Sequence, residues 1–154
     1  MKDEDLEPTD DPAAGARRTP VPAAPRTATA ARLSVLVVDD EPLVSRAVVR
    51  LLAAEHAVCV AETAEDALAT IEGGDRYDAV VCDLALPGMS GCDLHARIAA
   101  RDPALARRFV FLTGGAFTDA STRYLASCDV PCVEKPFQAD RLREAIRAAA
   151  GRKG

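Results

Sequence analysis

Short apolar runs alternate with amphipathic stretches along most of the chain. The runs lie at 33–38, 57–61, 77–82, 109–112 and 130–134. Continuous apolar runs of this length are typical of strands that are buried on both faces of a parallel sheet. After each run, apolar residues recur at helical spacing, which predicts five helices. The alternation therefore predicts an α/β domain in which five helices cover both faces of a five-stranded parallel sheet.

Local signals place several boundaries of these elements. Pro42 predicts a helix start, because proline is tolerated in the first helical turn. Thr63, three residues before Asp66, resembles a capping box with Asp in place of Glu or Gln. A short helix is expected over 118–127, and Pro131 predicts an edge position for the last strand.

Residues 1–32 lack this pattern. They hold five of the ten prolines and show no apolar periodicity. Residues 1–11 carry six acids and one lysine, whereas 12–32 carry four arginines and no acid. Such a composition buries too little apolar surface to offset chain entropy, so a disordered tail is predicted in front of a domain spanning 33–152. The tail could be a docking segment for a partner, a solubilising extension or the remnant of a linker.

Composition narrows the classes of function. A net charge of −5 argues against nucleic-acid binding, which needs a basic face. No apolar run approaches the roughly 20 residues of a membrane helix, and the acidic start does not resemble a signal peptide. The five cysteines and two histidines show no disulfide or zinc-ligand spacing. We therefore expect a soluble, cytoplasmic protein with no membrane or nucleic-acid partner.

Polar residues stand directly after the predicted strands. Asp39 and Asp40 follow the first strand, Asp83 the third, Thr113 the fourth and Lys135 the fifth. In open parallel sheets, ligands bind beyond the carboxyl ends of the strands, so we expect these side chains to converge. Each residue alone has an ordinary explanation, such as a turn or a helix cap. Their joint position at strand ends favours one functional site.

The residue types at these strand ends suit a phosphoryl group and a cation. Three crowded carboxylates need a proton or a cation to offset their repulsion, and hard oxygen ligands suit Mg²⁺. The Thr113 hydroxyl and the Lys135 ammonium could both bind a phosphoryl group. Lys135 is also unusual in composition, because the chain has 16 arginines but only three lysines, the other two near the termini.

Four segments carry a resemblance to a known family. They are VLVVDDEP (35–42), VVCDLALPGMSG (80–91), FLTGG (111–115) and VEKPF (133–137). Together they resemble the response-regulator receiver domain, the CheY-like phosphoacceptor module of bacterial two-component signalling. The resemblance implies a flavodoxin-like doubly wound α/β fold with strand order 2-1-3-4-5.

The resemblance also implies a role for each residue of the site. Asp83 would be the phosphoacceptor. The implied Mg²⁺ ligands are Asp39, Asp40, Asp83 and the carbonyl of Ala85. The implied phosphoryl contacts and switch residues are Thr113, Gly114 and Lys135. One position departs from the family: Cys132 stands three residues before Lys135, where an aromatic switch residue is usual.

The implied function is that of a single-domain response regulator. It would accept a phosphoryl group from a sensor histidine kinase or a phosphotransfer protein and signal by altered binding of a downstream protein. Because the chain ends at Gly154, soon after the last predicted helix, we expect no output domain. The domain would assist its own phosphorylation and dephosphorylation without being a turnover enzyme.

Three alternatives stay open at this point. The chain could be a phosphate sink or a receiver detached from a hybrid kinase, with no output partner of its own. It could be an interaction scaffold that never accepts phosphate, although the acidic site argues against that. A phosphatase that forms an aspartyl phosphate usually has a second acid two residues after its nucleophile, where this chain has Ala85.

Overall fold

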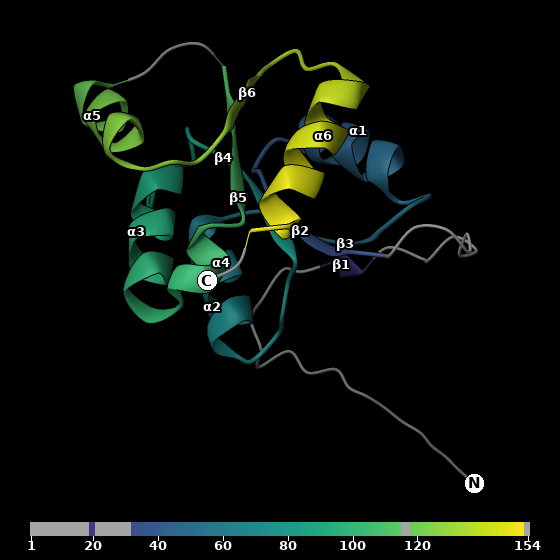
Figure 1. The fold of residues 1–154 in the computed structure, drawn as a ribbon, viewed down its shortest axis with the longest axis horizontal. Coiled ribbons are helices and arrows are strands. Elements are labelled where there is room, and N and C mark those ends of the chain that lie inside the picture. Colours follow the sequence, from purple (N-terminus) through teal and green to yellow (C-terminus); the bar gives the residue numbers. More distant parts are fainter. Residues whose placement is uncertain (1–18, 21–31, 115–117, 153–154) are drawn as a thin grey trace, which may run out of the picture.

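The computed structural model describes residues 19–20, 32–114 and 118–152, whose strands form one sheet (Figure 1). The strands are β1 (Thr19–Pro20), β2 (Ser34–Val38), β3 (Ala57–Ala61), β4 (Ala79–Asp83), β5 (Phe109–Thr113) and β6 (Cys132–Glu134). The helices are α1 (Pro42–Leu52), α2 (Ala64–Glu72), α3 (Gly91–Arg101), α4 (Pro103–Ala106), α5 (Asp119–Ser127) and α6 (Ala139–Ala150). Helices therefore follow the strands in the predicted alternation.

The sheet has the order β1-β3-β2-β4-β5-β6, and the five strands from β2 to β6 pair in parallel. Numbered from β2 along the chain, these five strands have the order 2-1-3-4-5, which confirms the predicted flavodoxin-like topology. β6 lies at one edge, as Pro131 predicted.

β1 was not predicted. It pairs antiparallel with the outer side of β3, Thr19 opposite Val60 and Pro20 opposite Cys59. Both residues belong to the predicted tail, most of which lies outside the described residues. The predicted disorder of the rest of the tail therefore stays a prediction.

Several boundaries differ from the predictions. The prediction of five helices was one short for the described residues, because α4 adds a sixth. α4 is a single turn, too short to show an apolar period, and it is capped by the Asp102 side chain with Pro103 in its first turn. β4 begins at Ala79, two residues later than predicted, and extends through Asp83. β6 covers only 132–134 of the predicted 130–134.

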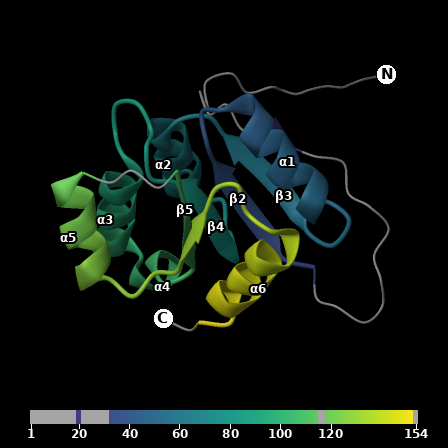
Figure 2. The ribbon, with the colours of Figure 1, turned by 90° about the horizontal axis from the view of Figure 1, so that it is seen from above.

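Two hydrophobic layers flank the sheet. The strands alternate their side chains between the layers, so that Val35 and Val37 face α1 and α6, whereas Leu36 and Val38 face α2, α3 and α4. Figure 2 shows α1 and α6 on one side of the sheet and α2, α3 and α5 on the other. This double cover is the reason that the strands read as continuous apolar runs rather than alternating ones. No helix in the described ranges is long and apolar enough to cross a membrane.

Candidate functional site

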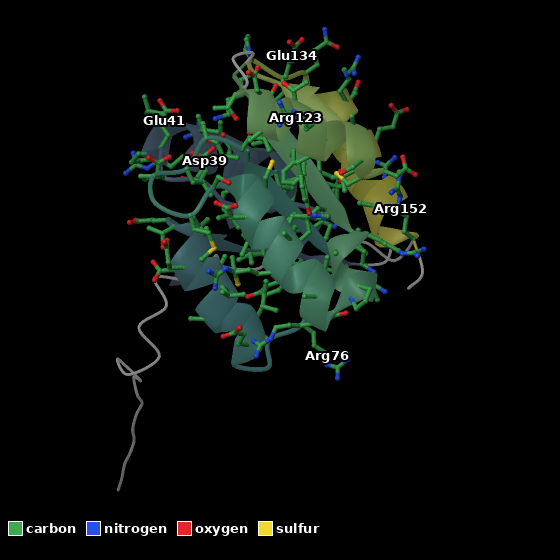
Figure 3. All side chains as sticks on the ribbon, turned by 90° about the vertical axis from the view of Figure 1, so that its left-hand side faces the viewer. Asp39, Glu41, Arg76, Arg123, Glu134 and Arg152 are labelled. Atoms are coloured by element: carbon green, nitrogen blue, oxygen red, sulfur yellow. The ribbon has the colours of Figure 1, made fainter. Side chains whose placement is uncertain are left out.

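Three carboxylates meet at the carboxyl edge of the sheet. Asp39 directly follows β2, and Asp83 is the last residue of β4, the strand paired with β2. Asp39, Asp40 and Asp83 each offer one carboxylate oxygen, and these three oxygens all lie within 4.8 Å of one another. Asp39 and Asp83 are buried, while Asp40 is exposed. Figure 3 labels Asp39 beside Glu41, the residue just before α1.

Lys135 reaches this cluster from the far edge of the sheet. Its Nζ lies 3.0 Å from Asp83 Oδ2 and 3.4 Å from Asp39 Oδ2. The backbone N–H of Lys135 donates to the Thr113 carbonyl at 2.7 Å, which ties the residue after β6 to the end of β5. The structure thus brings the predicted Asp39, Asp40, Asp83 and Lys135 together.

Backbone N–H groups hold two of the carboxylates. Ala85 N–H donates to Asp83 Oδ1 at 3.1 Å, and Glu41 N–H donates to Asp39 Oδ1 at 2.9 Å. Each of these carboxylates therefore accepts from an amide two residues ahead through Oδ1 and faces Lys135 with Oδ2. The side chains are oriented before any ligand binds.

Burial shifts the pKa values of Asp39 and Lys135 toward their neutral forms, and the interaction between the two side chains acts against both shifts. Burial raises the pKa of Asp39, the Asp83 charge raises it further, and the Glu41 N–H and Lys135 act against this rise. Burial by itself lowers the pKa of Lys135, but the hydrogen bond to Asp83 and the charges of Asp39 and Asp83 outweigh it, so the pKa is raised. Lys135 is therefore a firmly protonated cation, whereas the ionised form of Asp39 is disfavoured.

Thr113 ends β5 next to the acidic cluster. It is buried, and its Oγ1 has no hydrogen-bond partner among the described residues. A buried, unpartnered hydroxyl is costly unless a ligand satisfies it. A Cβ placed on Gly114 would meet no described residue within 4 Å apart from its chain neighbours, so the space beside Gly114 is open in the described part of the chain. Gly115, the other end of the FLTGG segment, lies outside the described residues.

The loop between β4 and α3 carries residues that sequence reasoning missed. A Cβ on Gly91 would lie 2.4 Å from the Asp83 carbonyl oxygen, so only glycine allows α3 to start this close to the site. Ser90 and Asp93 form a reciprocal capping box at that helix start. Glu65 of α2 accepts from Met89 N–H at 3.2 Å. The S-x-x-D spacing was a readable signal, whereas the contacts of Gly91 and Glu65 depend on the fold.

The donor set fits a hard divalent cation. Three carboxylates face one ammonium group, which leaves an excess of negative charge in a partly buried cluster. Carboxylate oxygens together with open space on the exposed Asp40 side suit Mg²⁺, which keeps several of its waters. At the same edge of the sheet, Thr113 has an unpartnered hydroxyl and Lys135 an ammonium group, and both kinds of group bind anions.

Cys132 occupies the position of the usual aromatic residue. It is the first residue of β6, pairs in register with Phe111 of β5 and is exposed. Although the residue as a whole is exposed, partial burial of its thiol group raises its pKa, and the proximity of Cys128 and Cys92 adds to this rise. The structure therefore shows no aromatic ring at this position.

Comparisons with known proteins agree with this geometry. The family model of the response regulator receiver domain matches residues 35–147. The transcriptional regulatory protein TcrA of Mycobacterium tuberculosis is 37% identical over 120 residues, which are 77% of this chain and 46% of that protein. The chemotaxis protein CheY of Listeria monocytogenes is 31% identical over 122 residues, 77% of this chain and 98% of that protein.

One solved structure adds the fold to these comparisons. The receiver domain of a sensor histidine kinase from Pseudomonas aeruginosa PAO1, with a magnesium ion coordinated in its active site cleft, superposes with a TM-score of 0.68. It is 24% identical, and the match covers 79% of this chain and 99% of that one. The chain spans about half the length of TcrA. By family model, sequence identity and fold, the chain belongs to the response regulator receiver domains of two-component systems.

Proposed function

We propose that this chain is a single-domain response regulator in which Asp83 accepts a phosphoryl group from the phosphohistidine of a sensor kinase or a phosphotransfer protein. Receiver domains accept phosphoryl groups from histidine kinases. The observation that carries the assignment is the position of Asp83, hydrogen-bonded to Lys135 and clustered with Asp39 and Asp40. The signal would leave the domain as a changed affinity for a downstream protein.

The proposed transfer is a displacement at phosphorus. A carboxylate oxygen of Asp83 attacks the phosphorus, a P–O bond forms, and the P–N bond to the donor imidazole breaks. The electron pair of that bond returns to the imidazole nitrogen. Lys135 neutralises negative charge on the phosphoryl oxygens, and the Thr113 hydroxyl donates a hydrogen bond to one of them. Lys135 needs to move little for this role, because its Nζ already lies 3.0 Å from Asp83 Oδ2.

Asp39, Asp40, Asp83 and the carbonyl of Ala85 are the residues that would hold Mg²⁺. When bound, the cation supplies positive charge for the phosphoryl oxygens and offsets the mutual repulsion of the carboxylates. Two observations support this choice: the clustering of the three acids, and the magnesium ion in the related Pseudomonas domain. The exposed side of the cluster, at Asp40, leaves room for the waters that Mg²⁺ retains.

The product of the transfer is a mixed carboxylic–phosphoric anhydride, which water can hydrolyse. The domain therefore takes part in its own phosphorylation and dephosphorylation, and the phosphoryl group is lost with Asp83 regenerated. This cycle makes the domain a resettable phosphoacceptor rather than an enzyme that releases a modified substrate.

The test is phosphoryl uptake from acetyl phosphate, followed by intact mass. With Mg²⁺, the full chain should gain one phosphoryl group, which hydroxylamine should remove because it cleaves acyl phosphates. Asp83→Asn should gain none, and Asp40→Ala should lose the dependence on Mg²⁺. Asp140→Asn, which alters an exposed acid on α6, is the matched control and should behave as the wild type. Wild-type uptake by Asp83→Asn would refute the assignment, and no uptake by any chain would favour the scaffold alternative.

A further inference from the structure

Two pairs of side chains link α3 to α5. Tyr124 Oη lies 2.5 Å from His95 Nδ1, and Ser121 approaches the Cys92 thiol, lowering its pKa against the larger, raising effect of burial. Cys92 and His95 are three residues apart on α3, and Ser121 and Tyr124 are three apart on α5. Residues at this spacing share one helix face, so the two pairs are neighbouring contacts between the helices, one helical turn apart.

The protonation of the His95 ring determines which group donates the hydrogen bond between His95 and Tyr124. His95 Nε2 lies 2.9 Å from the Ala106 carbonyl oxygen, which can only accept, so Nε2 carries the proton. Nδ1 of the neutral ring is then an acceptor, and the Tyr124 hydroxyl is the donor. Burial lowers the pKa of His95 and so favours this neutral form.

His95 also connects its hydrogen bond with Tyr124 to β5, the strand that carries Thr113. Its ring packs edge-on against Phe109 and Phe111 of β5, with centroid distances of 4.9 and 5.6 Å. Side chains two residues apart on a strand share a face, so Phe111 and Thr113 lie on the same side of β5. A series of contacts therefore runs from Phe111 through His95 to Tyr124, and it begins on the face of β5 that also carries Thr113.

α5 depends on few contacts for its position. None of its residues is fully buried, and Figures 1 and 2 show it at the margin of the fold, beside α3. A cavity of about 460 Å³ lies between α5, α3 and the loop after β4, and Ala85, Ser121 and Tyr124 are among its lining residues. The helix thus has space to shift, and the cavity extends to the loop that directly follows Asp83.

We propose that the His95–Tyr124 pair couples the phosphoryl site to α5. The pair would thus take the place of the usual aromatic switch residue, which is absent because Cys132 stands at that position. The pair is made in the unphosphorylated chain and holds α5 against α3. When the Thr113 hydroxyl turns to a phosphoryl group on Asp83, the packing of Phe111 against His95 changes and the Tyr124 hydrogen bond is released. This inference rests on the proposed phosphorylation of Asp83 and adds the residues that transmit it.

Hydrogen–deuterium exchange of 119–127 in the full chain tests the coupling, with and without acetyl phosphate and Mg²⁺. In the wild type, exchange in α5 should rise about fivefold on phosphorylation, the change expected for loss of one hydrogen bond. Tyr124→Phe should show the raised exchange already without phosphate and little further change. It should also take up phosphoryl groups several-fold faster, because its α5 no longer has to be released.

Thr122→Val is the matched control. It also removes a hydroxyl from α5, but one that donates to the Thr118 carbonyl within the helix, so it should respond as the wild type does. Intact mass on the same samples separates the two hypotheses. Phosphoryl uptake without any difference in α5 exchange between Tyr124→Phe and Thr122→Val overturns the coupling alone. Absence of uptake in every chain overturns the proposed function and the coupling with it.

Discussion

Asp39 is the less well compensated of the two buried partners of Lys135. Its Oδ2 lies 3.4 Å from the ammonium nitrogen, against 3.0 Å for Asp83 Oδ2, and the charges of the two carboxylates repel each other. Burial and that repulsion raise the pKa of Asp39, so its ionised form costs folding free energy. The ionised acidic cluster therefore destabilises the folded chain when no cation offsets its charge.

We expect Asp39→Asn to raise the free energy of unfolding at pH 7 by about 1 kcal/mol, because an isosteric amide removes a poorly paired buried charge. A folded pKa above the model-peptide value of 3.8 means that the folded state binds the proton more tightly than the unfolded state. The penalty is therefore complete above the folded pKa and disappears as the pH falls toward 3.8. Urea unfolding at pH 7 and pH 4.5 measures this difference.

Added Mg²⁺ provides the control for this prediction. Binding to the folded state should stabilise the wild type, by an amount that rises with the logarithm of the Mg²⁺ concentration above the Kd, and Asp39→Asn should gain much less. The variant should thus be the more stable chain in a chelator, with a smaller difference once Mg²⁺ is present. A variant less stable than the wild type in the chelator would contradict the repulsion argument.

Gly91→Ala should disrupt the site by displacing the backbone at Asp83 and Leu84. The added Cβ would meet the Asp83 carbonyl oxygen at 2.4 Å and the Leu84 Cα at 3.0 Å, and backbone atoms cannot yield as side chains can. We expect a loss of about 2 kcal/mol or more in unfolding free energy, together with slower phosphoryl uptake. Gly151→Ala, whose Cβ would make only ordinary contacts of 3.5 Å and beyond, should leave both properties nearly unchanged.

The two histidines should make stability fall in mild acid. Burial lowers the pKa of both His56 and His95 below 6.5, so below that pH the unfolded chain takes up protons that the folded chain does not. Their contribution is fully present above pH 6.5 and is lost as the pH falls through the folded pKa values. Thermal unfolding at pH 7.5 and 5.5 should show the decline, and His95→Gln should show a smaller one. An equal decline in the variant would exclude His95 as a source.

The site could be predicted from the sequence because of one geometric rule. Asp39, Asp83, Thr113 and Lys135 stand at the ends of different strands, and the carboxyl ends of parallel strands meet at one edge. No knowledge of side-chain packing is needed for this step. The apolar runs likewise predicted a parallel sheet covered on both faces, because such runs are typical of its strands, whereas the strand order was predicted from the family resemblance.

Other features depend on packing that a linear pattern does not contain. His95 and Tyr124 are 29 residues apart and meet only because α3 and α5 lie side by side. Gly91 is an ordinary loop glycine in sequence, and its need for glycine arises from the nearby Asp83 backbone. β1 lies in a proline-rich stretch with no strand pattern, and only its pairing with β3 defines it.

Removal of the predicted tail should leave the site intact. A chain that starts at Ala31 lacks only the two described residues of β1, whereas every residue of the acidic cluster stays. We expect phosphoryl uptake at the wild-type rate and a thermal midpoint within a few degrees of the full chain. Calorimetry and intact mass check both, and a fall of many degrees would show that the tail packs on the domain.

The pairing of β1 with β3 also bears on self-association. A bare edge strand can accept a strand from another molecule, and proteins usually block that route. At one edge, the strand is β6, which has only three residues and directly follows Pro131. At the other edge, Thr19 and Pro20 pair with Val60 and Cys59 of β3. Because proline has no N–H to donate, the covering segment is itself a poor template for further strands. The same shortened chain should therefore form edge-to-edge oligomers at high concentration, a tendency that the full chain's own N-terminal segment suppresses.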